Sequence, residues 1–226
     1  KEPKKMCAVI DYKPPGQGTV YESPERIALY LANGQPSGYF LCATRHVPTG
    51  GEIDHFPNSA AVLELCTDRG SETVTVSGPT TVAVDIGAQG QTTQTVGGRD
   101  TVRTRMLQLD LSGTSTMGAV SVRLNPAQAS EGDITEQVNA TAGILDVRPF
   151  RASGLADSCF NMYVEITVQT PNGPVVLYNK EPKKMCAVID YKPPGQGTVY
   201  ESPERIALYL ANAQPSGYFL CATRHV

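Results

Sequence analysis

The sequence has little of what several classes of protein require. It contains no Trp and only 7% aromatic residues, whereas sugar-binding modules usually rely on exposed aromatic rings. Charged residues make up 18% of the chain, below the ~25% that is usual for globular domains. The formal net charge is −3 and no basic stripe is present, which argues against nucleic acid as a partner. No apolar run approaches the ~20 residues of a membrane span.

Catalytic motifs are also missing or broken. Residues 113–119 are similar to the nucleophile segment of subtilisin-like proteases, but Thr116 is inserted between Ser115 and Met117. The segment that begins at Asp110 departs by one inserted residue from an aspartic-protease motif, and the second copy that a carboxylate dyad needs is absent. We therefore predict no catalytic residues, no cofactor and no enzyme activity.

Metal ligands occur only in incomplete sets. Cys42 and His46 are two ligands at a spacing of four, whereas a zinc site takes three or four. Glu52, Asp54 and His55 lie close together in a segment flanked by Gly and Pro, where a hard cation such as calcium could bind. A solvated loop is the favoured interpretation of this segment, so we predict no metal site and keep these three residues as the weak candidates.

What the sequence does contain is a long internal duplication. Residues 1–47 recur as residues 180–226, with Gly34 replaced by Ala213 as the single difference. One interpretation is that the parent protein is an array of near-identical units of about 180 residues, each long enough to be a domain. The other is that a copied segment was appended by engineering. Drift between recent duplicates would explain the one substitution, so the array is favoured, with 1–47 a partial copy and 48–226 one complete unit.

Alternating apolar residues predict strands throughout the chain. This period of two places one set of side chains inward and the other toward water. The expected strands are residues 6–12, 61–66, 72–76, 80–86, 107–111, 120–124, 144–148 and 162–168. A hairpin is expected around Asn172-Gly173. With Gly and Pro between the runs, the pattern indicates an all-β fold, an antiparallel β-sandwich of immunoglobulin-like or jelly-roll-like type, as one sandwich or two subdomains.

Two segments could instead be helical. Residues 23–34 have Pro24 at a favourable first position, but their apolar residues alternate, which favours a strand. Asp133 and Glu136 have the spacing of a capping box, so residues 133–140 could form one short helical turn.

The chain has six cysteines, and a complete unit holds four of them. An even number allows disulfides in an oxidising compartment, with three pairings for four cysteines. Free cysteines that pack as small apolar side chains are the alternative, and both remain open. The six are Cys7, Cys42, Cys66, Cys159, Cys186 and Cys221.

The segment from Tyr163 to Tyr191, with Leu177-Tyr178-Asn179, Pro182, Met185 and residues 187–190, is similar to repeated β domains of very large bacterial secreted or surface proteins. The resemblance implies a structural or adhesive role, outside the cell or on its surface, with no catalytic residues. We therefore expect a structural repeat of a fibre, sheath or surface layer that associates with itself, head to tail or between neighbouring repeats, by strand exchange. An adhesin module that binds glycans or proteins and a non-catalytic domain of a large secreted enzyme are the alternatives.

Overall fold

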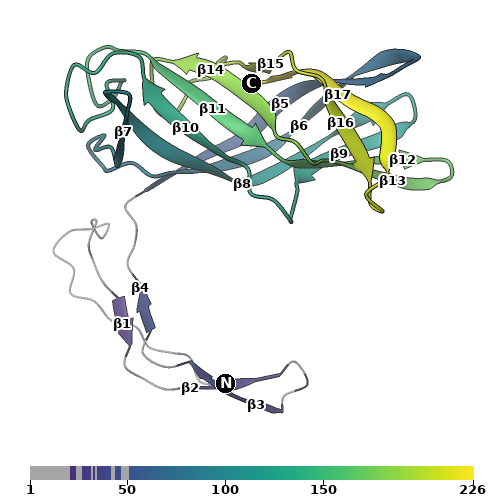
Figure 1. The fold of residues 1–226 in the computed structure, drawn as a ribbon, viewed down its shortest axis with the longest axis horizontal. Coiled ribbons are helices and arrows are strands. Elements are labelled where there is room, and N and C mark those ends of the chain that lie inside the picture. Colours follow the sequence, from purple (N-terminus) through teal and green to yellow (C-terminus); the bar gives the residue numbers. More distant parts are fainter. Residues whose placement is uncertain (1–20, 24–26, 32, 34, 42–43, 47–50) are drawn as a thin grey trace. The chain divides into compact units, whose positions relative to one another are not determined.

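The computed structural model describes residues 21–23, 27–31, 33, 35–41, 44–46 and 51–226, and it divides into two compact units, Lys1–Gly51 and Glu52–Val226. All regular structure in these ranges is strand, and the strands pair antiparallel (Figure 1). The prediction of an all-β, antiparallel chain is therefore confirmed. Across the described residues we find no helix with the length and apolar character needed to cross a membrane.

The smaller unit contains two short strand pairs. β1 (Tyr21–Ser23) pairs with β4 (Thr44–His46), and β2 (Ile27–Tyr30) pairs with β3 (Pro36–Leu41). Their registers repeat those of the second copy: Tyr21 faces His46 as Tyr200 faces His225. The strand over 27–30 confirms the favoured interpretation of residues 23–34. In the described residues of the smaller unit these pairs form two separate two-stranded sheets with the registers of the second copy.

The larger unit is a 13-stranded sheet. Its strands are β5 (Glu52–Thr67), β6 (Gly70–Val84), β7 (Gln94–Val96), β8 (Arg99–Ser115), β9 (Gly118–Leu124), β10 (Glu131–Glu136), β11 (Ala156–Met162), β12 (Val164–Thr170), β13 (Gly173–Asn179), β14 (Lys183–Ile189), β15 (Tyr200–Ser202), β16 (Ile206–Leu210) and β17 (Pro215–His225). In Figure 1, β7 and the β12–β13 hairpin lie at opposite ends of this unit.

The sheet closes on itself. Its order is β10-β11-β14-β15-β17-β16-β13-β12-β9-β8-β6-β5, and the further pairings β10–β8 and β17–β5 join strands that a linear order leaves apart. The strands therefore belong to one sheet instead of the two separate sheets of the expected sandwich. A period of two marks one inward face in either architecture, so the sequence pattern could not separate them. Closure also removes the exposed edges that invite pairing with other chains.

Three long strands, β5, β6 and β8, lie next to one another in the closed sheet. β5, β6 and β8 are 16, 15 and 17 residues long, and each of them bears a break in register. A bulge bends a strand and increases its twist, which lets a long strand follow a curved wall. The duplicated segment belongs to this wall, because β14 pairs with β11, β16 with β13 and β17 with β5.

Of four further expectations, the structure confirms one and contradicts two, and the fourth concerns residues that it does not describe. The hairpin is confirmed: β12 and β13 pair with Thr170 opposite Gly173, around a two-residue turn. Residues 131–136 form strand β10, so the helical turn expected at 133–140 is wrong there. Residues 144–148 form no strand and contribute only isolated bridges. The strand expected at residues 6–12 lies outside the described residues.

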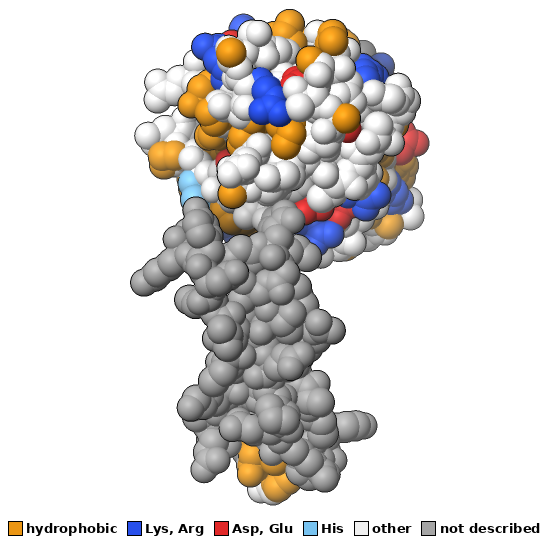
Figure 2. Space-filling view, turned by 90° about the vertical axis from the view of Figure 1, so that its left-hand side faces the viewer, with side chains coloured by type: hydrophobic (Ala, Val, Ile, Leu, Met, Phe, Trp, Pro, Cys, Tyr) orange, Lys and Arg blue, Asp and Glu red, His pale blue; other side chains and the backbone are white. Residues whose placement is uncertain are grey.

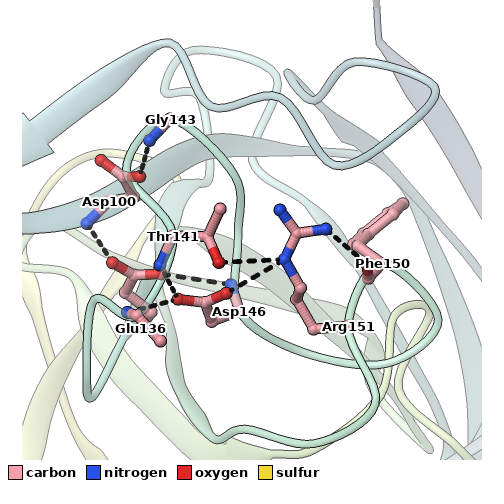
Figure 3. A network of polar contacts seen from close by, with 8 residues as sticks. Asp100, Glu136, Thr141, Gly143, Asp146, Phe150 and Arg151 are labelled. Atoms are coloured by element: carbon pink, nitrogen blue, oxygen red, sulfur yellow. Dashed lines mark hydrogen bonds and ion pairs between the residues drawn. The ribbon is translucent and has the colours of Figure 1, made fainter.

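One end of the sheet is joined to the segment 137–155 by buried carboxylates (Figure 3). Glu136, which is fully buried, accepts hydrogen bonds from the backbone amides of Asp100 at 2.8 Å and Asp146 at 3.1 Å. Asp146 in turn accepts from the amides of Ala140 and Thr141 at 2.6 and 2.8 Å. Burial raises the pKa of the Glu136 carboxyl, and the two amide bonds oppose that rise. These contacts satisfy amides of a loop that has no strand partners.

Two disulfides cross-link neighbouring strands. Cys66 on β5 is bonded to Cys221 on β17, and Cys159 on β11 is bonded to Cys186 on β14. Of the alternatives left open by the sequence, disulfides therefore hold for these four cysteines. Cys7 and Cys42 lie outside the described residues.

Candidate ligand-binding cavity

The closed sheet surrounds a cavity of about 600 Å³. Its wall is formed by inward-facing residues of β5, β6, β8, β11, β14 and neighbouring strands. Much of the wall is apolar, and methionines contribute to it from three different strands. Methionine side chains are flexible and polarisable, so they adapt to irregular shapes. Residues typical of the wall are Val82, Met106, Leu109, Phe160, Met162 and Met185.

The cavity reaches solvent between two segments of irregular backbone. The first is the bulge of β5, where Pro57 and Asn58 line the cavity and are exposed. The second is the loop 193–198 after β14, in which Gly195 is also both exposed and cavity-lining. These residues are exposed and line the cavity at once, so they mark its opening.

A buried ion pair fastens the loop to β5. Lys192 is 1% exposed, and its Nζ lies 2.7 Å from Glu52 Oε2 and 2.8 Å from Asp54 Oδ1. Burial raises the pKa of the Asp54 carboxyl, while the Lys192 ammonium acts to lower it. Since Lys192 directly precedes the loop and Asp54 precedes the bulge, the pair fixes the two sides of the opening to each other.

A second polar pair lies on the wall. Tyr200 Oη and Ser158 Oγ are 2.9 Å apart and share a hydrogen bond. Burial raises the pKa of the Tyr200 phenol, the Ser158 hydrogen bond opposes that rise, and the nearby Asp54 carboxylate adds to it. The phenol is therefore neutral at physiological pH and is not set up as a base.

Lys183 is a buried cation held by backbone oxygens. It is 1% exposed, and its Nζ donates to the carbonyl of Cys221 at 2.6 Å and to the carbonyl of Glu204. Burial lowers the pKa of Lys183 to about 8, an effect that the charge of Glu204 partly opposes. The bonds join β14 to the β15–β16 connection and to β17, where the sheet offers few ladder hydrogen bonds.

Three buried polar atoms of the wall have no hydrogen-bond partner in the described part of the chain. They are the hydroxyl oxygens of Thr80 on β6 and Thr104 on β8, and the Nε2 atom of His225 on β17. Burial lowers the pKa of the His225 ring, which favours its neutral form. An unpartnered buried polar group costs about 1–3 kcal/mol. Ser202 Oγ, whose residue does not line the cavity, is a fourth such atom among the described residues.

Two of the three weak metal candidates from the sequence, Asp54 and His55, line the cavity. Strand β5 contains Glu52, Asp54 and His55, so these residues do not form the expected solvated loop. The Glu52 and Asp54 carboxylates both form ion pairs with Lys192. His55 is exposed and its Nδ1 lies 3.3 Å from Thr81 Oγ1. No group of three or more potential metal ligands occurs in the part of the chain described here.

The broken motif at Ser115 is a turn of the closed sheet. Ser115 Oγ donates to the carbonyl of Gly118 at 3.1 Å, closing the β8–β9 hairpin. Gly118 has a φ of +142°, and a Cβ atom there would lie 1.9 Å from the carbonyl oxygen of Gln169. The spacing of Gly and Ser in this segment thus follows from hairpin geometry.

Sequence reasoning missed the two lysines that matter most, Lys183 and Lys192. Lys183 had a readable signal, because it shares the inward period of β14 with Met185 and Ile189. Lys192 had none, since its carboxylate partners lie more than a hundred residues away in the chain.

No protein-family model matches the chain, and no curated protein matches it. Among solved structures, the chain is similar to DynF from the dynemicin biosynthesis pathway of Micromonospora chersina. The identity is 20%, the TM-score is 0.59, and the match covers 79% of this chain and 80% of DynF. At this identity the likeness shows a shared fold.

This comparison corrects the functional expectation. The sequence was interpreted as a structural repeat of a fibre, sheath or surface layer, with an adhesin module or an accessory domain of a secreted enzyme as alternatives. The fold is instead that of a protein from a biosynthetic pathway. The interpretation failed because neither strand alternation nor duplication indicates whether the inward-facing side chains fill a core or surround a cavity.

The outer surface carries no large area of one charge on the face that Figure 2 shows. Lys and Arg side chains form several separate groups there, with fewer Asp and Glu side chains and with hydrophobic side chains between them.

Proposed function

We propose that this chain binds a small, mainly apolar molecule inside its closed sheet and serves a biosynthetic pathway as a binding protein. The observation that carries the proposal is the cavity of about 600 Å³ with its apolar wall. Cavities of roughly 300–1,000 Å³ with apolar linings and a few placed polar groups are typical of small-molecule sites. The link to a pathway rests on the likeness to DynF.

Binding without catalysis is supported by the state of the polar groups. The Asp54 carboxylate is engaged by Lys192, the Tyr200 phenol by Ser158, and Lys183 by two carbonyls. A general base or nucleophile needs a proton or electron pair that is free to reach the substrate. His225 is the exception, because its Nε2 atom has no partner in the described part of the chain. The expectation that the chain is no enzyme stays part of the proposal on the strength of the three engaged groups.

Location and repeat organisation also remain proposals. The two disulfides favour an oxidising compartment, in keeping with the expected extracellular or cell-surface location. The full-length parent sequence would decide whether near-identical units follow one another.

The proposal is tested by filling the cavity. Leu109 lines it, whereas Leu107 on the same strand is half exposed. Leu109→Trp should weaken binding of the fluorescent hydrocarbon methylpyrene at least tenfold, and Leu107→Trp should leave it unchanged. Because the chain has no Trp, each variant also carries a single fluorescent reporter of its own environment. Absence of methylpyrene binding to the unchanged protein, or equal weakening by both variants, would contradict the proposal.

A further inference from the structure

Lys192 forms an ion pair that differs from the others in the described part of the chain. Its side chain is fully buried, and its Nζ lies 2.8 Å from Oδ1 of Asp54, whose side chain is 6% exposed. The other ion pairs among the described residues use arginine, and most are exposed at both ends, as between Arg105 and Glu131. A guanidinium keeps its proton in proteins, whereas a buried lysine can lose one and become a nucleophile.

The Asp54 carboxyl has less support for its charged form than the other buried carboxyls. Glu136 and Asp146 each accept two backbone amides, and Asp100 accepts one. Within the described residues, Asp54 accepts a hydrogen bond from Lys192 alone. Burial raises the pKa of the Asp54 carboxyl, because desolvation favours the neutral acid. A proton can therefore pass from Lys192 to Asp54, which leaves a neutral amine beside a carboxylic acid.

These two groups are close enough to react with each other. The Asp54 carboxyl carbon is bonded to Oδ1 at about 1.2 Å, so it lies within roughly 4 Å of Lys192 Nζ. Reacting atoms that are held about 3–3.5 Å apart have effective concentrations far above those reached in solution.

Glu52 supplies the third group that such a reaction needs. Its Oε2 lies 2.7 Å from the same Nζ, which is hydrogen-bond distance for a proton transfer. Its side chain is 38% exposed, so it can exchange protons with water while Lys192 and Asp54 stay enclosed. The three residues thus combine an amine, a carboxyl group for it to attack, and a proton carrier.

We propose that Lys192 Nζ and Asp54 Cγ become joined by an amide bond that the folded chain forms by itself, with Glu52 as the proton carrier. The amine lone pair attacks the carboxyl carbon and forms the C–N bond. Glu52 takes a proton from the nitrogen and passes one to the departing hydroxyl, so the C–O bond breaks and water leaves. One amine and one carboxylic acid become one amide and one water, with no oxidant, reductant or cofactor. The ion pair is the state from which this reaction starts.

The amide would crosslink the two sides of the cavity opening. Lys192 directly precedes the loop 193–198, Asp54 precedes the bulge of β5, and the two residues are 138 positions apart in the chain. Thiols reduce disulfides but do not cleave an amide, so this crosslink would hold in reducing and oxidising surroundings alike. The inference goes beyond the proposed binding function and does not depend on it.

Mass spectrometry of the whole chain, denatured and with its disulfides reduced, tests the bond directly. The unchanged protein should be lighter than its sequence by the mass of one water, and Lys192→Arg should have the full mass. A tryptic digest of the unchanged protein should contain residues 46–69 linked to residues 185–205. A loss of stability on substitution of Lys192 would follow from the ion pair alone, so the mass decides and the stability does not.

The duplication provides a matched control. Lys13 has the same neighbours in sequence as Lys192, and residues 6–26 give the same tryptic fragment as residues 185–205. Lys13→Arg should therefore leave the loss of water in place. Asp54→Asn should lose one ammonia instead of one water, because the side-chain amide then supplies the leaving group. Glu52→Gln should slow the loss of water at least about a hundredfold in a time course after cell-free synthesis.

Three outcomes would overturn the inference. The first is a folded, unchanged protein that keeps its full mass, which would leave the site as a buried ion pair. The second is a loss of water that persists in Lys192→Arg, and the third is one that disappears in Lys13→Arg. If Lys192→Arg does not fold, the linked fragment in the Lys13→Arg variant still identifies the bond, because Lys192 is then the one lysine that can supply it. Methylpyrene binding is measured separately, so failure of the bond and failure of the proposed function are distinguishable.

Discussion

Lys192 Nζ lies 2.8 Å from Asp54 Oδ1, and this buried contact joins the loop after β14 to the first strand of the closed sheet. The ammonium is fully enclosed, so its charge depends on Asp54 and Glu52 for compensation. Removing one member of a buried pair leaves an uncompensated charge, which costs far more than an exposed pair contributes.

Lys192→Met should therefore lower the free energy of unfolding by about 3–5 kcal/mol. Urea denaturation followed by circular dichroism measures this. The matched control is Lys184→Met, at an exposed position on β14, where we expect a change within about 0.5 kcal/mol. Equal effects of the two substitutions would show that the pair does not hold the opening together.

Lys183 should make stability depend on pH above neutrality. Its pKa is about 8 in the folded chain and 10.5 in the unfolded one. Below about 8 both states are protonated and the burial penalty is constant. Between about 8 and 10.5 the unfolded chain keeps a proton that the folded chain has lost, so the free energy of unfolding rises with pH, by up to roughly 3 kcal/mol. Lys183→Met should remove this rise when the two proteins are compared by urea denaturation across the window. Parallel pH profiles would contradict it.

Glu136→Gln tests the network in Figure 3. Glu136 uses both carboxylate oxygens to accept backbone amides, from Asp100 and from Asp146. Glutamine offers one acceptor and places an NH₂ group against the other amide, so we expect a loss of about 1–3 kcal/mol. Glu131→Gln, which alters an exposed pair with Arg105, should cost less than about 1 kcal/mol. Hydrogen exchange should show faster opening of residues 137–155 in the first variant only.

Ala213 is the position at which the two copies differ, and it has a φ of +65° in the turn between β16 and β17. A residue with a Cβ loses about 1–2 kcal/mol in this left-handed region, whereas the first copy has glycine there. Glycine also makes the unfolded chain more flexible, so Ala213→Gly should stabilise by a net ~0.5–1 kcal/mol. Ala207→Gly, within strand β16, should have the opposite sign. Thermal unfolding of both variants measures whether the first is more stable, and the second less stable, than the unchanged protein.

Strand exchange between chains stays a prediction. The smaller unit carries the same sequence as strands of the larger one and shows their registers, so it could pair with a neighbouring chain. Deletion of residues 1–47 should then leave a folded monomer and abolish any association. Light scattering at rising concentration measures this. A monomer for both lengths of chain would show that the duplicate does not exchange.

The sequence could predict those parts of the structure that depend on the pattern of residues close together in the chain. Alternation found β9 and the β12–β13 hairpin because β9 pairs with β8 and β12 with β13, which are neighbours in the chain. The β17–β5 pairing and the Cys66–Cys221 bond could not be found that way, since they join residues more than 150 positions apart. The sequence could not predict the cavity either, for a related reason. The inward period of Val82, Met106 and Leu109 is the same whether the side chains fill a core or line a space.

The β17–β5 pairing also sets an order of events during synthesis. The paired residues of β5 and β17 lie more than 150 positions apart in the chain. As the chain leaves the ribosome, the edge of β5 stays open until β17 emerges, and non-local pairings of this kind are slow to form. Loss of β17 would leave unpaired edges on β5, β15 and β16, and such edges recruit other chains into aggregates.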